Sequence, residues 1–201
     1  MEIIWVHPAL TLILGYLLGS IPFGLLLTRI TGAGDLRTIG SGNIGATNVL
    51  RTGRKGLAAA TMLLDMAKGA AAVLVGRWLA VDGVDYAITG GCAAFIGHCY
   101  PIWLRFNGGK GVATLLGIGF ALDWRIGLIS ALVWLGGLAI SRISSVGGLA
   151  SALAAPIVAF LIGEVQWGVA LTGLALMVLW KHRANIARLR AGTEPRIGQK
   201  T

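Results

Sequence analysis

The sequence predicts an all-α integral membrane protein, and composition and apolar runs together support this prediction. Of the 201 residues, 56% are hydrophobic and 12% are charged, and the mean hydropathy is +0.79. A soluble domain of this length needs more charge to cover its surface. Long apolar runs cover residues 9–27, 57–81 and 126–140, and about 20 apolar residues let a helix cross a bilayer. We therefore expect a single polytopic membrane domain over residues 1–201.

Seven transmembrane helices are expected, over residues 6–30, 56–81, 85–104, 111–122, 126–140, 147–163 and 167–180. No Lys or Arg precedes Arg29, so the first span lacks the basic start of a cleavable signal peptide and is expected to be retained. The fourth span is short, which favours a broken or tilted helix. Asp65 and Lys68 lie in the second span. Because charged groups are costly in lipid, we expect them to pair on an inward face.

The positive charges predict the orientation of these spans. Fourteen of the 17 Lys and Arg residues lie on one side of the predicted membrane. They are Arg29 and the Lys and Arg residues of alternate connections, which cover residues 31–55, 105–110, 141–145 and 181–201, including Lys200. The opposite side holds Arg77 and Arg125 with the acids Glu2, Asp82, Asp85, Asp123 and Glu164. Because Lys and Arg concentrate in cytoplasmic loops, the N-terminus is expected outside and the C-terminus in the cytoplasm. The net charge of +9 therefore reflects topology, and no nucleic-acid partner is expected.

The first cytoplasmic loop contains "SGNIGATNVLRTGRKG", residues 41–56, with three positive charges and no carboxylate. A guanidinium such as that of Arg51 can bind a phosphate through two hydrogen bonds, which a Lys cannot do. An ordinary positive-inside loop requires only charge. It does not explain the polar side chains among the glycines, which are Ser41, Asn43, Thr47 and Asn48. The stretch therefore predicts an anion site.

The second cytoplasmic loop lies within "GHCYPIWLRFNGGKGVAT", residues 97–114. Its glycines would let backbone N–H groups approach an anion, while Lys110 adds charge and the next helix adds N-terminal donors. The predicted cradle consists of Gly108, Gly109, Lys110 and Gly111. It is not a Walker A motif, because the glycine spacing differs and Val112 stands where Ser or Thr would follow. A flexible basic turn at a membrane surface remains the alternative.

Two further cytoplasmic segments carry candidate residues. In "KHRANIARLRAGTEPRIG", residues 181–198, His182 and Asn185 would share a helix face. The same segment predicts an amphipathic helix lying on anionic lipid through Arg183, Arg188 and Arg190. In "SRISSVGG", Ser144 and Ser145 stand at a span boundary, where hydroxyls are commonly helix caps. A lone interfacial His is likewise more often structural than catalytic.

Several chemistries lack the residues they need. The predicted cytoplasmic surface has the carboxylates of Asp35 and Glu194, with Asp65 below it. These are too few for a two-metal phosphotransferase site. There is no His followed four residues later by Asp, as in soluble and monotopic glycerolipid acyltransferases. We therefore expect neither a metal nor a cofactor, and a site that holds two anions without a strong base.

Three motifs together resemble the signatures of the bacterial acyl-phosphate:glycerol-3-phosphate acyltransferases. They are "GSGNIGATNVLR", "GHCYPIWLRFNGGKGVAT" and "HRANIARLRAGTE", in the family's order, and the similarity includes "LLGSIPFG" and "DMAKG". Ala184 stands where the family often has Glu. The resemblance implies acyl transfer from acyl phosphate to the 1-hydroxyl of sn-glycerol 3-phosphate, giving 1-acylglycerol 3-phosphate and phosphate. It also implies a multi-pass protein of the bacterial inner membrane, acting in phospholipid biosynthesis on the cytoplasmic side and supplied by an upstream acyl-phosphate-forming enzyme.

By this resemblance the catalytic residues are Ser41, Arg51, Lys110, His182 and Asn185. The loop chemistry adds expected substrate- and phosphate-binding residues, which are Asn43, Thr47, Asn48, Gly108, Gly109, Gly111, Ser144 and Ser145. Glu194 is implied to be structural. Either His182 or a substrate phosphate oxygen could accept the hydroxyl proton.

Three other interpretations of the residues stay open. An organic-phosphate transporter also needs cations facing a cavity, but it needs access from both sides. A non-catalytic membrane scaffold needs only basic loops and leaves the Ser, Asn and Gly pattern unexplained. Acyl-CoA could replace acyl phosphate as the donor, which composition does not exclude.

Overall fold

The computed structural model describes residues 5–81 and 83–198, and within them every regular element is a helix apart from one isolated bridge between Val81 and Val84. The predicted all-α class is therefore confirmed. Glu2, Asp82 and Lys200, which contribute to the predicted charge asymmetry, lie outside the described residues. The chain forms two compact units that meet in sequence between Leu122 and Asp123. Each unit is described separately.

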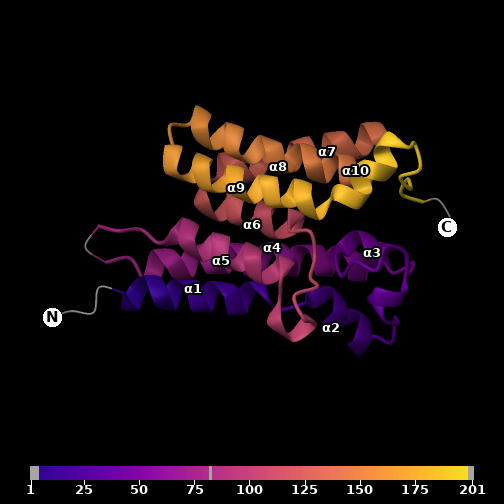
Figure 1. The fold of residues 1–201 in the computed structure, drawn as a ribbon, viewed down its shortest axis with the longest axis horizontal. Coiled ribbons are helices and arrows are strands. Elements are labelled where there is room, and N and C mark those ends of the chain that lie inside the picture. Colours follow the sequence, from indigo (N-terminus) through magenta and orange to yellow (C-terminus); the bar gives the residue numbers. More distant parts are fainter. Residues whose placement is uncertain (1–4, 82, 199–201) are drawn as a thin grey trace. The chain divides into compact units, whose positions relative to one another are not determined.

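The first unit is built around α4, which packs against most of the other helices of the unit (Figure 1). Its α-helices are α1 (Val6–Gly19), α2 (Phe23–Ile30), α3 (Ala46–Leu50), α4 (Lys55–Trp78), α5 (Ala87–Cys99) and α6 (Val112–Leu122). Two short 3₁₀ helices are η1 (Leu36–Thr38) and η2 (Ile102–Leu104). Glycines let these helices approach closely: a Cβ on Gly117 of α6 would collide with the backbone carbonyl of Met66 in α4. Small residues at such crossings are typical of membrane helix packing.

The first predicted span is two helices rather than one continuous helix. α1 ends at Gly19 and α2 begins at Phe23, because Pro22 lacks an N–H group and disfavours helical backbone in the residue before it. Other elements bind the carbonyls that the break exposes. The indole Nε1 of Trp103 donates to Ser20 O over 2.6 Å, and Lys68 Nζ donates to Ile21 O over 2.8 Å. The break is therefore held from outside, as backbone groups in a membrane must be.

The second unit consists of four helices in sequence, with α8 packed against both α7 and α9. They are α7 (Trp124–Ser141), α8 (Ser144–Leu161), α9 (Val165–Lys181) and α10 (Arg183–Arg190). The α7–α8 turn is tight: Arg142 has φ of 60°, and Ser141 Oγ donates to Gly137 O over 2.6 Å. A Cβ on Gly147 would lie 2.5 Å from Trp134 O, so α7 and α8 touch through their backbones. The helix predicted after residue 181 is present as α10.

The described residues contain five segments long and apolar enough to cross a membrane. They are Val6–Ile30, Lys55–Trp78, Ala87–Leu104, Trp124–Ser141 and Ser144–Leu161. Shorter apolar helices, α6 and α9, coincide with the other two predicted spans. Large apolar side chains also point outward from the middles of helices, among them Leu63, Leu132, Ile157 and Leu176. Such faces suit lipid contact, while the count of seven crossings and their direction stay predictions.

Candidate functional site

Asn48 organises the first loop from the inside. Its side chain is buried; Nδ2 donates to Leu36 O over 2.8 Å and to Ile39 O over 3.0 Å. Its Oδ1 accepts the N–H of Ser41 at 3.3 Å. An amide side chain has two N–H donors, and both are used here by the loop's own backbone. Asn48 therefore shapes the loop, and its predicted part in substrate or phosphate binding stays a prediction.

Exposed polar side chains lie around this buried amide. The Arg51 guanidinium places Nη1 3.5 Å from Asn48 Oδ1. It also lies beside Gly40, where φ is +52° and an added Cβ would come within 2.7 Å of Arg51 Cδ. Ser41 and Thr47 are exposed. The first loop thus presents one cation and two hydroxyls together, a donor set suited to an anion.

Asn43 and Asp35 of the first loop form hydrogen bonds with other residues of the same loop. Asn43 Oδ1 accepts the Gly45 N–H at 2.9 Å, an Asx turn that leads into α3. Asp35 accepts a two-pronged contact from Arg37, with Arg37 Nε 2.9 Å from Asp35 Oδ1. Side-chain and backbone hydrogen bonds from Arg37 lower the pKa of Asp35 to about 2. Asp35 therefore stays ionised, and Arg37 compensates its negative charge.

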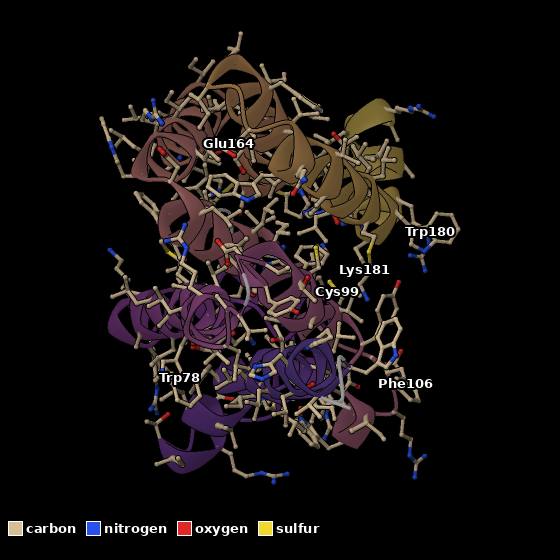
Figure 2. The ribbon with its side chains drawn as sticks, turned by 90° about the vertical axis from the view of Figure 1, so that its left-hand side faces the viewer. Trp78, Cys99, Phe106, Glu164, Trp180 and Lys181 are labelled. Atoms are coloured by element: carbon tan, nitrogen blue, oxygen red, sulfur yellow. The ribbon has the colours of Figure 1, made fainter. Side chains whose placement is uncertain are left out.

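The glycines of the second loop serve close packing. The N–H of Gly108 donates to Cys99 O at 3.1 Å, and that of Gly109 donates to His98 O at 3.0 Å, so both bond the C-terminal carbonyls of α5. Gly111 has φ of +85° and lies against the Phe95 ring. The N–H groups of Gly108 and Gly109 are therefore bonded within the protein, and phosphate binding by this loop stays a prediction. Figure 2 shows Cys99 directed into the unit, and the loop then runs outward to the exposed residue Phe106.

Lys110 follows these packed glycines and is partly buried, with contacts of its own. The backbone on either side of it is fixed, by the Gly109 hydrogen bond before it and by the start of α6 after it. Its ammonium group is therefore carried on a constrained stretch of chain. Sequence analysis missed His98, whose ring lies against Gly109. A buried ionisable side chain in a membrane span is itself a sign of function.

Glu194 connects three residues of the second unit. Its carboxylate accepts hydrogen bonds from Ser145 Oγ at 2.7 Å, Asn185 Nδ2 at 2.5 Å and Arg188 Nε at 2.6 Å. Burial alone would raise the pKa of Glu194, but hydrogen bonds from Asn185, Ser145 and Arg188 lower it below its usual value. These contacts agree with the structural role implied for Glu194. They also make Asn185 part of a support rather than an isolated surface amide.

The two serines at the start of α8 differ in position. Ile143 is the N-cap residue of α8, and no side-chain hydrogen bond caps this end of the helix. The helix-cap interpretation of Ser145 is therefore wrong, because its buried hydroxyl is hydrogen bonded to Glu194. Ser144 is partly buried and has contacts of its own.

His182 stands at the junction of α9 and α10 and is buried, as is Asn185. Its Nδ1 lies 2.9 Å from Val178 O. A carbonyl can only accept, so Nδ1 carries a proton and a neutral ring would have its lone pair on Nε2. Figure 2 shows Trp180 pointing away from α9, and the Arg183 guanidinium lies 5.0 Å from the centre of that indole. Such an Arg–Trp pair suits a membrane interface.

The first unit thus brings Ser41 and Arg51 to the same side-chain oxygen of Asn48, and the second unit joins Ser145 and Asn185 through Glu194. Among the residues that the structure describes, no group of three or more His, Cys, Asp or Glu side chains is placed to hold a metal ion. Apolar outward faces and basic connections between helices are typical of an integral membrane protein.

The chain belongs to the glycerol-3-phosphate acyltransferase family, whose model matches residues 9–192. A curated relative of that name from Ruegeria pomeroyi is 59% identical, over 96% of this chain and 97% of the relative. Another, from Mesorhizobium japonicum, is 54% identical, over 95% of this chain and 96% of the relative. The motif resemblance is therefore confirmed, and the protein is an acyltransferase with several apolar membrane helices.

Solved structures agree with this family. The chain matches PlsY (YgiH), described as an integral membrane glycerol 3-phosphate acyltransferase, in its glycerol 3-phosphate form with a TM-score of 0.89 and 37% identity, over 95% of this chain and 96% of that one. It matches the lysophosphatidic acid form with a TM-score of 0.87 and 36% identity, over 95% of each chain.

Proposed function

We propose that the protein transfers an acyl group from acyl phosphate to the 1-hydroxyl of sn-glycerol 3-phosphate. The products are 1-acylglycerol 3-phosphate, which is lysophosphatidate, and inorganic phosphate. The family match over residues 9–192 carries this proposal. The glycerol 3-phosphate and lysophosphatidic acid forms of PlsY support the acceptor and the product, and the three motifs support acyl phosphate as the donor.

The reaction needs charge compensation more than strong acid catalysis. The 1-hydroxyl oxygen of glycerol 3-phosphate attacks the acyl carbonyl carbon. The bond between that carbon and the bridging phosphate oxygen then breaks, and its electron pair leaves with the phosphate. An acyl phosphate is already an activated anhydride, so the departing phosphate leaves readily once its charge is balanced. We assign this role to Arg51 and Lys110, with Ser41 and Thr47 orienting a phosphate. The positions of the two cations on ordered backbone support this assignment.

The proton of the attacking hydroxyl has two possible acceptors. One is an oxygen of a substrate phosphate, which would account for the small number of protein bases. The other is Nε2 of His182, since Nδ1 faces the Val178 carbonyl. His182→Gln separates them: an unchanged pH–rate profile eliminates His182 as the base, whereas loss of the limb near its pKa assigns it that role.

The remaining candidates are proposed to support or contact the substrates. Ser145 of α8 and Asn185 of α10 are joined through Glu194, and Asn48 shapes the loop that carries Arg51. Asn43, in the turn before α3, and Ser144, the first residue of α8, are proposed to contact a substrate phosphate. Gly108, Gly109 and Gly111 let the second loop fold tightly enough to present Lys110.

The site is proposed to face the cytoplasm from the bacterial inner membrane. The basic balance of the predicted cytoplasmic connections supports this orientation. The acyl chain would then lie between helices at the depth of the inner leaflet, with its phosphate at the loops. The donor comes from an enzyme that forms acyl phosphate, and the product enters phospholipid synthesis.

The test uses purified protein in detergent or lipid mesophase with palmitoyl phosphate and glycerol 3-phosphate. Phosphate release and lysophosphatidate formation are followed together, for the wild type, Lys110→Ala and the matched control Lys55→Ala, whose Lys is exposed. Equal amounts of both products, lost only in Lys110→Ala, support the proposal. Turnover with palmitoyl-CoA but not with palmitoyl phosphate contradicts acyl phosphate as the donor. If folded protein turns over neither donor, the acyltransferase proposal fails and the organic-phosphate transporter is favoured.

A further inference from the structure

A cluster of three ionisable side chains lies inside the first unit. Lys68 Nζ is 2.7 Å from Asp65 Oδ1, and both side chains are at most 4% exposed. Nδ1 of His98, on α5, is 3.7 Å from the same Asp65 oxygen and is equally buried. The predicted inward pairing of Asp65 and Lys68 is confirmed, and His98 extends the pair from α4 to α5.

One side of this cluster holds the break between α1 and α2. Lys68 Nζ donates to Ile21 O over 2.8 Å and lies 5.8 Å from the centre of the Phe23 ring. The ammonium group thus binds the backbone where α1 stops and the ring where α2 begins. α2 leads into the first loop at its other end, so Lys68 holds the start of the helix that precedes that loop.

The other side of the cluster underlies the second loop. The Gly109 N–H donates to His98 O over 3.0 Å. A Cβ added to Gly109 would collide with Nε2 of the His98 ring and would lie 2.7 Å from its Cε1. The ring therefore lies directly against the residue that precedes Lys110.

The second loop and the helix break are also joined directly. Trp103, in η2, donates to Ser20 O over 2.6 Å, and Tyr16 Oη of α1 donates to Tyr100 O over 2.9 Å. Figure 1 shows the connection between α5 and α6 descending beside the break. Asp65, between Lys68 and His98, is thus the centre of one chain of contacts from the start of α2 to the second loop.

Stability alone does not explain such a cluster. Removing charges from water is costly, and replacing a buried ion pair with apolar residues of similar volume is often neutral or stabilising. Charged side chains inside membrane segments are rare for the same reason. A purely structural contact between α4 and α5 would be served equally well by apolar side chains.

We propose that Asp65, Lys68 and His98 are positioning residues for acyl transfer. They hold the start of α2, the helix that leads into the first loop, and the Gly109–Lys110 segment in the geometry that the reaction requires, without touching the substrates. This inference rests on the proposed function, because both loops carry residues assigned to it. Misplacement of a reacting group by about 1 Å costs on the order of 100-fold in rate. Loss of the cluster is therefore expected to reduce kcat strongly while the fold persists.

The main test is the double variant Asp65→Leu/Lys68→Met, which keeps the buried volume and removes both charges together. We expect a thermal unfolding midpoint in detergent close to that of the wild type, because removing two buried charges offsets the loss of the donor to Ile21 O, with kcat at least about 10-fold lower. Thr11→Val is the matched control, because Thr11 is a buried polar residue bonded within α1 to His7 O. A double variant that is stable and fully active overturns the proposal.

A second variant keeps the proposal testable if the double variant does not fold. His98→Phe preserves a ring against Gly109 but removes the nitrogen facing Asp65. We expect about a 10-fold loss in kcat with a smaller change in KM, partly restored in His98→Asn, whose amide can face Asp65. Wild-type kcat in His98→Phe, or the same kcat loss in both His98 variants, contradicts the assignment.

Hydrogen–deuterium exchange separates this inference from the reaction itself. The Gly108 and Gly109 N–H groups bond α5 carbonyls, so their exchange reports on the second loop without any substrate. Faster exchange over residues 105–111 in both variants, with Thr11→Val unchanged, supports positioning even if the wild type does not use acyl phosphate. Unchanged exchange in both variants contradicts positioning, whereas an inactive wild type contradicts only the proposed function.

Discussion

Replacing Gly109 by Ala tests how the second loop is supported. The new Cβ would meet the His98 ring at Nε2, with Cε1 at 2.7 Å and Cδ2 at 3.0 Å. The ring is buried, so it has little room to turn aside. We expect the strain to be relieved by movement of the loop backbone, and Lys110 moves with it.

The size of the effect follows from these distances. A Cβ in ordinary contact lies at least 3.4 Å from its neighbours, so the backbone must shift by about 1 Å. Overpacking of this kind costs about 1–3 kcal/mol of stability, and a 1 Å displacement of a reacting group costs on the order of 100-fold in rate. Activity should therefore fall much further than the folded fraction.

The assay is initial phosphate release from palmitoyl phosphate with glycerol 3-phosphate, together with thermal unfolding in the same detergent. Gly56→Ala is the matched control, because Gly56 lies in the first turn of α4 and no atom lies within 4 Å of an added Cβ. It should keep wild-type activity and gain up to about 1 kcal/mol from helix propensity.

Wild-type kcat/KM in Gly109→Ala refutes the reasoning, because it means that the loop near His98 is not constrained. The double variant Gly109→Ala/His98→Ala provides a second check. Removing the ring makes space for the Cβ, so its activity should equal that of His98→Ala alone rather than the product of the two losses. Fully multiplicative losses contradict a clash between these two residues.

Three further outcomes are expected. Glu194→Ala should cost about 2–4 kcal/mol, since buried donors on Ser145 and Asn185 lose their acceptor; in thermal unfolding the exposed-residue control Glu164→Ala should be neutral, and equal midpoints for both contradict the network. Because the folded pKa of Asp35 is lowered from 3.8 to about 2, its pairing with Arg37 should be complete above pH 3.8 and lost as the pH falls through about 2, followed by carboxyl NMR; titration near 3.8 excludes the pairing. Gly117→Ala, whose Cβ would meet the Met66 carbonyl, should lower the unfolding midpoint more than Gly136→Ala, which has open space; the reverse order contradicts the close contact of α4 and α6.

Helix content and position were predictable from apolar runs because burial in lipid imposes long, nearly uncharged segments. The proline break was not predicted, although "SIPFG" contains its signal, because hydropathy ignores the missing N–H of Pro22. Asp65 and Lys68 were paired correctly because their spacing of three residues is local. His98 was missed because its contact with Asp65 joins two helices.

The loops were predictable in chemistry but not in geometry. Cations, hydroxyls and glycines indicated an anion site, yet composition does not tell whether a glycine N–H faces a ligand or a helix end. At Gly108 and Gly109 the α5 carbonyls take these donors. Ser145 was likewise interpreted as a helix cap, because its partner Glu194 lies 49 residues away in the sequence. Contacts of that range are set by packing rather than by local pattern.

The central claim is that acyl phosphate is the acyl donor, and a competition experiment tests it most directly. Purified protein is given carbon-13-labelled palmitoyl phosphate, unlabelled palmitoyl-CoA and glycerol 3-phosphate together, and the lysophosphatidate is examined by mass spectrometry and regiochemical analysis. The account predicts labelled product acylated at the 1-hydroxyl, with phosphate released in equal amount. Unlabelled product from the same mixture would contradict it.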